Sequence, residues 1–170
     1  MAITVHLRAF KLQVSHNRRR MRYFLTRLEK NVPRGLQHAA ANADQAAWQR
    51  TDCRDCANCC KTMSPTYTKN DISRISAHLG MSEKAFKDKW LYKDKTGDWM
   101  NVSQPCQFLD TATNLCKIYE VRPGDCAGFP HHNKKLGPDY MHVFKQNVEF
   151  CPVTYRMVQA LMENLSGKGS

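Results

Sequence analysis

The residues with the clearest chemistry are four cysteines in one short stretch. Cys53, Cys56, Cys59 and Cys60 follow the spacing C-x2-C-x2-C-C. Two thiols separated by two residues can both bind one metal ion from a tight turn, and a third at the same spacing can add another ligand. Zinc ribbons use C-x2-C pairs, and bacterial iron–sulfur loops use three cysteines spaced as C-x2-C-x2-C. The stretch therefore predicts a metal site.

The chain holds eight cysteines, and the other four are scattered downstream. They are Cys106, Cys116, Cys126 and Cys151. Eight thiols suffice for two four-cysteine sites, or for one cluster with redox-active or spare thiols. We therefore treat all eight as candidate metal ligands, and we expect the region from Cys53 to Cys151 to close around metal.

The expected compartment decides how these thiols are interpreted. No apolar run approaches the ~20 residues that span a bilayer. The first residues lack the unbroken apolar segment and cleavage site of a signal peptide. We therefore expect a cytoplasmic protein with no membrane partner. In a reducing cytosol, eight cysteines favour metal or redox chemistry over a disulfide framework, which stays the lesser alternative.

Residue type does not choose between zinc and an iron–sulfur cluster, because both ions bind thiolates. Structural zinc usually takes two separated C-x2-C knuckles, and only one stretch here carries such pairs. The C-x2-C-x2-C rhythm and the distant Cys151-Pro152 resemble the ligand pattern of a [4Fe–4S] cluster, although the cysteine–proline pair normally lies closer. We favour [4Fe–4S], with Zn²⁺ as the alternative and mixed or transient metal as the remainder.

Two further groups of residues bear on the ligand set. Side chains of adjacent residues diverge in most backbone conformations, so Cys59 and Cys60 can serve different ions, or one can remain free. His131, His132 and His142 are candidate substitute ligands. For the histidines we favour a surface position over metal binding.

The chain is basic, with 26 Lys and Arg against 15 Asp and Glu and a formal charge of +11. A four-iron cluster on four cysteines carries about −2, which leaves the chain near +9. Arginines gather between Arg18 and Arg22, on a segment with helical spacing. Nucleic acid or an acidic protein is a possible partner for this stretch, but we favour a solvated helix face.

Helical signals flank the cysteines. We expect helices over residues 18–30 and 35–50, a break at residues 15–17, and a last helix that starts at Pro152 and buries Val153, Met157, Val158, Leu161 and Leu165. Residues 3–14 fit a strand or a helix equally well. Residues 166–170 are expected to fray.

The middle of the chain has a clear helix start and then little regular structure. Thr68 to Asp71 matches a capping box, before a helix that buries Ile72, Ile75 and Leu79 and stops at Gly80. Ser82 caps the next predicted helix. Glycines and prolines interrupt residues 93–138. Short strands are expected at residues 106–109, 116–119 and 140–148.

These elements predict a fold that is mainly α with short irregular β segments. It would be a small metal-stapled domain, with helices flanking a cysteine-rich loop core. The expected organisation is a basic helical N-terminal extension over residues 1–49, a cysteine-cluster metal-binding domain over 50–155, and a C-terminal helix and tail over 156–170.

The cysteines and their flanking residues resemble a known family. The segments are C53-x2-C56-x2-C59-C60, C106-x-F-L, C116-x-I-Y-E-V-R-P, C126-x-G-F-P and C151-P. Together they are similar to the CxxCxxCC cysteine-cluster (YkgJ-type) family, over about residues 50–155. The resemblance implies a domain that chelates zinc or iron. Ala57 stands where the family often has glycine, and Ala127 where an arginine usually follows the cysteine.

The expected function is metal binding, in metal handling or in redox and electron transfer. Flagellin lysine N-methylase is a relative of that family, so the resemblance also implies a cluster-dependent enzyme that modifies a protein or RNA. A zinc module whose basic helix binds nucleic acid is the third alternative. The sequence shows no catalytic motif of its own, and a methylase-like activity rests on the resemblance alone.

Overall fold

The computed structural model describes residues 5–166, and the chain divides into two compact units. Unit 1 comprises Met1–Cys56 and Pro130–Ser170, and unit 2 comprises Ala57–Phe129. The predicted fold class, mainly α with short β segments, is confirmed. The predicted domain boundaries at residues 49/50 and 155/156 stay predictions, because a division by contacts does not test which segments fold alone.

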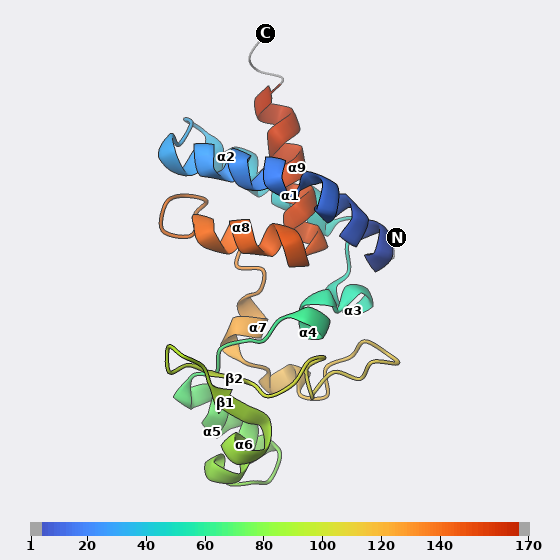
Figure 1. The fold of residues 1–170 in the computed structure, drawn as a ribbon, viewed down its shortest axis with the longest axis vertical. Helices are drawn as coiled ribbons and strands as arrows, with labels where there is room; N and C mark the ends of the chain where they lie inside the picture. The colour runs from blue at the N-terminus through green and yellow to red at the C-terminus, as the bar shows by residue number, and fades with distance from the viewer. Residues whose placement is uncertain (1–4, 167–170) are drawn as a thin grey trace. The chain divides into compact units, whose positions relative to one another are not determined.

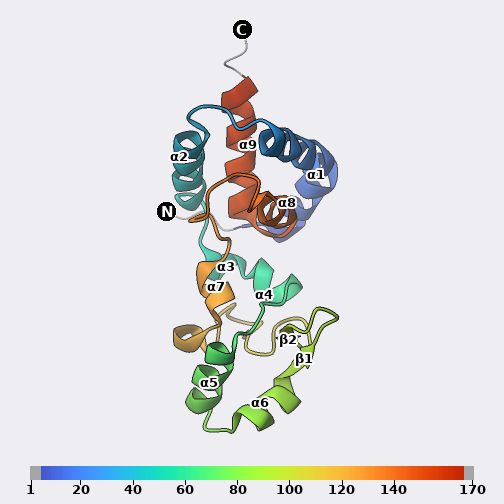
Figure 2. The same ribbon diagram turned by 90° about the vertical axis from the view of Figure 1, so that its left-hand side faces the viewer.

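Unit 1 is a bundle of helices built around the C-terminal helix. Its elements are α1 (Leu7–Lys30), α2 (Leu36–Trp48), α3 (Cys53–Cys56), α8 (Met141–Phe150) and α9 (Pro152–Ser166). Helix α9 contacts α1, α2 and α8, and Figure 2 shows it standing between α2 and α1. Val153, Met157, Val158 and Leu161 are buried as expected, so the apolar stripe of α9 forms the core of this unit.

Helix α1 runs without interruption through the segment where a break was expected. The predicted break at residues 15–17 is therefore wrong. Ser15 Oγ donates to the carbonyl of Leu12 at 2.7 Å, and Asn17 Nδ2 donates to that of Gln13 at 3.1 Å. These polar side chains bond back onto the helix instead of competing with it. From Leu7 onward the ambiguous segment is helical, whereas residues 3 and 4 lie outside the described residues.

The strand expected over residues 140–148 is also wrong, since this segment forms helix α8. Its buried residues recur every three or four positions, a helical rather than an alternating spacing. They are Met141, Phe144, Asn147 and Val148. Asn147 is buried despite its polarity, and its Nδ2 donates to the carbonyl of Pro130 at 3.0 Å.

Unit 2 combines short helices with one two-stranded antiparallel sheet (Figure 1). Its elements are α4 (Asn58–Thr62), α5 (Lys69–His78), α6 (Glu83–Trp90), β1 (Leu91–Lys93), β2 (Trp99–Asn101), the 3₁₀ helix η1 (Tyr119–Val121) and α7 (Gly124–Gly128). Leu91 pairs with Asn101 in the sheet. The predicted capping box is present, with Thr68 and Asp71 each accepting from the other's backbone.

An aromatic cluster forms the core of unit 2. Phe86 is fully buried and stacks on Phe108, with ring centroids 6.2 Å apart, and Tyr67 tilts against it from the other side. Ile72 and Ile75 join this core as predicted. Leu79 does not, because it follows the last turn of α5 and leaves 38% of its surface exposed.

The two cysteine-bearing strands expected at residues 106–109 and 116–119 are shorter than predicted. They meet in one antiparallel bridge between Leu109 and Cys116, supported by a hydrogen bond from Lys117 N to Phe108 O at 2.8 Å. The rest of each segment is a turn, and η1 begins at Tyr119. Within residues 5–166, no helix is long and apolar enough to cross a membrane.

Candidate metal centre

The eight cysteines are distributed over both units, and none of them forms a disulfide within residues 5–166. Unit 1 contains Cys53, Cys56 and Cys151, and unit 2 contains Cys59, Cys60, Cys106, Cys116 and Cys126. The C-x2-C-x2-C-C stretch is therefore shared between the units. Ala57, the first residue of unit 2, takes a left-handed conformation with φ +45°, which separates the short helices α3 and α4.

Four thiols of unit 2 lie close enough together to influence one another's charge. They are Cys60, Cys106, Cys116 and Cys126. The pKa of Cys106, of Cys116 and of Cys126 is raised first by burial and then by the charge of Cys60 among other groups. The six possible pairs among these four all interact in this way. The four cysteines come from α4, from the two segments that the Leu109–Cys116 bridge joins, and from α7.

Tyr67 is a buried residue beside this four-cysteine group. The phenol is 3% exposed. Burial raises its pKa, and the negative charges of Cys106, Cys126 and Cys116 raise it further. The hydroxyl therefore stays protonated and acts as a hydrogen-bond donor rather than as a metal ligand.

The backbone around Cys106 and Cys116 repeats one arrangement. The N–H two residues further on, of Phe108 and of Ile118 respectively, hydrogen-bonds to the thiol and lowers its pKa against the opposing effect of burial. Such N–H groups favour a thiolate. The N–H of Cys106 donates to the carbonyl of Cys60 at 2.8 Å, which ties this loop to α4.

Asp71 holds the segment that carries Cys126. Its Oδ1 accepts the N–H of Gly124 at 3.0 Å, where α7 begins, and a hydrogen bond from Arg74 at 2.8 Å. Arg74 also donates to the carbonyl of Arg122 at 2.9 Å. The capping residue of α5 therefore also positions α7. This second role was not predicted, because the capping pattern is local and the contact with Gly124 spans 53 positions.

Arg122 anchors its own loop. It donates to the carbonyl of Tyr119 at 2.7 Å, and its guanidinium lies 3.9 Å from the centre of the Tyr119 ring. These contacts fix the turn that leads from Cys116 to α7. The charge of Arg122 also lowers the pKa of Cys116, against the larger effect of burial.

The adjacent Cys59 and Cys60 differ in their surroundings. Their sulfur atoms are 4.0 Å apart. A hydrogen bond from Cys59 lowers the pKa of Cys60 to about 7, and the charge of Lys61 contributes to the same shift. Cys60 therefore ionises readily near neutral pH, and its charge raises the pKa of the three downstream cysteines.

The donor set of unit 2 fits a soft metal. Four thiols with partial burial can supply the Cys₄ ligation used by structural zinc and by iron–sulfur clusters alike. Within the described residues 5–166, no three His, Cys, Asp or Glu side chains converge tightly enough to hold an ion as they stand.

The cysteines of unit 1 have a different environment. Cys56 and Cys151 are buried and Cys53 is exposed. Burial raises the pKa of Cys151, although the N–H groups of Thr154 and Val153 at the start of α9 hydrogen-bond to its sulfur. The charge of Cys56 raises that pKa further, so these two thiols are neighbours. The prediction that all eight cysteines bind metal stays a prediction.

The side chain of His132 is buried and only 5% exposed, contrary to the surface position that was favoured. Its Nδ1 lies 2.5 Å from Asp44 Oδ1 and its Nε2 lies 2.8 Å from Thr154 Oγ1. The ring stacks on Phe144. Burial lowers the pKa of His132, despite the opposing effect of Asp44. With both nitrogens engaged, the ring is a structural group, whereas His142 is exposed as expected.

The basic face of α1 is partly neutralised within unit 1. Arg22 pairs with Glu149 at 3.0 Å and Arg18 contacts the same carboxylate at 3.8 Å. Lys145 and Glu29 form another pair between α8 and α1 at 2.5 Å. These ion pairs give two of the clustered arginines a role in helix packing.

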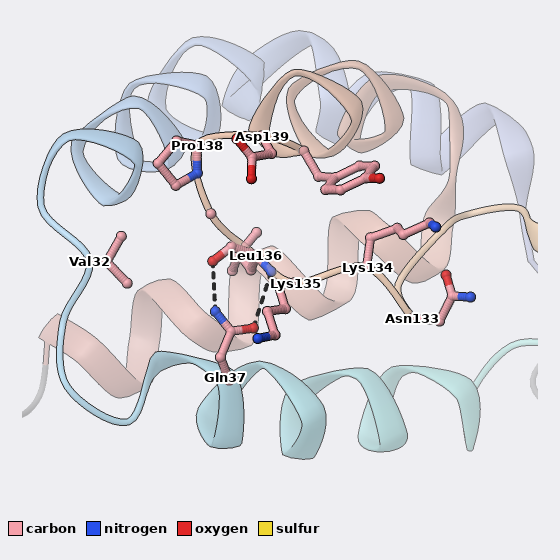
Figure 3. A pocket seen from close by; sticks show the side chains of 10 residues that line it. Val32, Gln37, Asn133, Lys134, Lys135, Leu136, Pro138 and Asp139 are labelled. Carbon is pink, nitrogen blue, oxygen red and sulfur yellow. Dashed lines mark hydrogen bonds between the residues drawn. The ribbon is translucent and has the colours of Figure 1, made fainter.

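A shallow hollow of about 460 Å³ lies in unit 1, at the loop before α8 (Figure 3). Gln37 borders it and bonds both the N–H and the carbonyl of Leu136, at 3.1 and 2.8 Å. Lys134 and Tyr140 also line it. None of its lining residues is a cysteine, so the hollow is separate from the thiol groups.

Comparison with known proteins places these residues in context. A family model named CxxCxxCC, described as a "Putative zinc- or iron-chelating domain", matches residues 52–152. An uncharacterized protein of Methanocaldococcus jannaschii is 33% identical over 81 residues, which cover 46% of this chain and 43% of that protein. The chain thus aligns with less than half of that relative's length. No solved structure matches.

Proposed function

Since the chain belongs to the CxxCxxCC family, whose members are described as zinc- or iron-chelating, we propose that unit 2 binds metal through Cys60, Cys106, Cys116 and Cys126. The observation that carries the proposal is the mutual electrostatic contact of these four thiols. Each thiolate would raise the pKa of its neighbours, so all four can be ionised together only when a cation neutralises their charge. A bound metal supplies that neutralisation.

The thiolates would serve the metal as its ligands, and the surrounding residues would hold the thiolates. N–H groups of the Cys106 and Cys116 turns stabilise the negative sulfurs, and Asp71 fixes the start of α7 beside Cys126. All four sulfurs are half-buried rather than enclosed. Such access suits metal exchange or electron transfer more than a purely structural ion, so we place the function in metal handling or redox chemistry.

The four proposed ligands are compatible with either Zn²⁺ or a [4Fe–4S] cluster. The sequence argument for a cubane used the rhythm of Cys53, Cys56 and Cys59 together with Cys151. In the structure, Cys53, Cys56 and Cys151 belong to unit 1, and the proposed ligands of unit 2 have a different spacing. Four thiolates serve either cofactor.

The test is metal analysis of protein purified without oxygen, with single Cys→Ser variants at the four positions. We expect stoichiometric metal in the wild type, and loss of most of it in Cys106→Ser, Cys116→Ser and Cys126→Ser. Iron with sulfide and a dithionite-bleached absorption identifies the cluster, and zinc alone identifies the other ion. Metal-free wild type, or full metal in Cys116→Ser, contradicts the proposal.

Cys59→Ser is the matched control, because it removes a thiol next to Cys60. Adjacent side chains rarely face one ion, so we expect this variant to keep its metal, whereas Cys60→Ser loses it. Amide hydrogen exchange gives an independent measure. Chelation should deprotect the loops of unit 2 more than α9, because metal binding energy is folding energy where regular structure is sparse. Equal metal loss in the two variants removes the distinction between Cys59 and Cys60.

A further inference from the structure

Asn101 is a buried polar residue beside the four-cysteine group of unit 2. It ends strand β2 and is 4% exposed. Its backbone N–H donates to Ser64 Oγ at 2.8 Å. Its side-chain oxygen Oδ1 accepts from the Tyr67 hydroxyl at 2.7 Å and from Gln107 Nε2 at 3.0 Å. The residue is therefore held at both its backbone and its amide.

The orientation of the Asn101 amide follows from one backbone group. The carbonyl of Trp90 can only accept, and Gln107 Nε2 lies 3.3 Å from it. Gln107 must therefore present its NH₂ group there, and the second hydrogen of that group points at Asn101. Only an oxygen of Asn101 can accept it, so the NH₂ group of Asn101 faces the opposite way.

That NH₂ group is buried and has no hydrogen-bond partner among the described residues. Cys106 is the neighbouring thiol: burial raises its pKa, and the nearby Asn101 side chain lowers it against that larger effect. A neutral thiol is a weak acceptor, whereas a thiolate accepts strongly. The buried donor is thus matched to a charged sulfur.

We propose that Asn101 Nδ2 donates a hydrogen bond to the metal-bound thiolate of Cys106, and that Tyr67 and Gln107 hold the amide in this orientation. The inference rests on the proposed function. Asn101 is a positioning residue: it orients one ligand and reduces the negative charge on its sulfur. Partners of metal ligands typically change metal affinity by about 10–100-fold when they are removed.

The decisive variant is Asn101→Asp, which keeps the shape and the oxygen that accepts from Tyr67 and Gln107. It replaces the donor by a carboxylate oxygen next to the sulfur. In protein reconstituted with Zn²⁺, we expect zinc affinity, measured by chelator competition, to fall by about 10–100-fold. The matched control is Asn70→Asp, the same change at an exposed position of unit 2, which should leave the affinity within a factor of about 2 of the wild type.

The second measurement is the alkylation rate of each cysteine in the zinc-loaded protein, followed by mass spectrometry of peptides. Without the hydrogen bond the sulfur of Cys106 is more nucleophilic, so Cys106 should react faster in Asn101→Asp while Cys116 keeps its rate. A purely structural role for the amide would instead accelerate all four cysteines together. That result, or no change in either measurement, overturns the inference.

Tyr67→Phe keeps the inference testable if Asn101→Asp does not fold. This variant retains the buried ring and removes the hydroxyl that fixes the amide, so a smaller acceleration of Cys106 alone is expected. An unchanged Cys106 rate in Tyr67→Phe also overturns the inference. Failure of the proposed function looks different: the wild type then binds no metal, whereas failure of this inference leaves wild-type binding intact.

Discussion

Asp71 should be the most sensitive carboxylate of unit 2. Its side chain is 5% exposed and accepts four hydrogen bonds. One oxygen accepts from Thr68 N at 2.9 Å and Thr68 Oγ1 at 2.7 Å, and the other accepts from Gly124 N at 3.0 Å and Arg74 at 2.8 Å. Asp71→Asn keeps the size of the side chain and tests these contacts.

The magnitude follows from the number of donors that lose an acceptor. An asparagine offers one oxygen, so its NH₂ group must face either the Thr68 N–H or the Gly124 N–H. A buried donor left without an acceptor costs about 1–3 kcal/mol, and each hydrogen bond to a charged group is worth about 1.5–3 kcal/mol. Because partial rearrangement recovers some of this, we expect Asp71→Asn to lower the free energy of unfolding by about 2–4 kcal/mol.

The assay is urea unfolding followed by tryptophan fluorescence in a Trp48→Phe background. The remaining tryptophans, Trp90 and Trp99, both pack against the core of unit 2 and report on that unit. Asp88→Asn is the control, because Asp88 is 61% exposed and pairs only with Lys84 at the surface. It should change the free energy of unfolding by less than about 0.5 kcal/mol.

The pH dependence gives a second test of the same contacts. Burial raises the pKa of Asp71, but the hydrogen bonds from Thr68, Gly124 and Arg74 outweigh it and hold the pKa below the usual 3.8. The contribution of Asp71 to stability is therefore complete above pH 3.8 and is lost as the pH falls through the lower folded value. The difference between wild type and Asp71→Asn should shrink in that range. A loss at pH 7 no greater than that of Asp88→Asn would refute this reasoning.

Two further predictions concern the backbone of the cysteine stretch and the buried histidine. Ala57 has a positive φ, and Ala57→Gly should change the free energy of unfolding by less than about 1 kcal/mol. Glycine relieves the left-handed penalty of about 1–2 kcal/mol, and this gain offsets the added entropy of the unfolded chain and the lost methyl contact. Ala57→Val should instead lower the free energy of unfolding, measured in urea, by more than about 2 kcal/mol. The pKa of His132 is lowered in the folded protein, so the unfolded state binds more protons and wild-type unit 1 should lose stability as the pH falls below 6.5. The urea midpoint of the wild type should therefore fall with pH in this range, whereas that of His132→Gln should not. Equal slopes in the two proteins would show that His132 is not the group responsible.

Local patterns in the sequence determined the helices and the chemistry of the site. The capping box at Thr68 and Asp71 and the apolar stripe of α9 each depend on residues within one or two turns, so they could be recognised without a partner. The cysteine spacing likewise predicted soft-metal ligation. Two local judgements were wrong: residues 15–17 bond back onto α1, and the mixed polarity of residues 140–148 concealed a helical period.

Only the tertiary structure decided which cysteines are neighbours. Cys60 and Cys126 are far apart in sequence, and they come together in unit 2 because the Leu109–Cys116 bridge and the Asp71–Gly124 hydrogen bond fold the loops back. No residue pattern encodes such pairings, because each depends on the packing of several elements at once. The orientation of Asn101 has the same origin: the Trp90 carbonyl fixes Gln107, and Gln107 fixes the Asn101 amide.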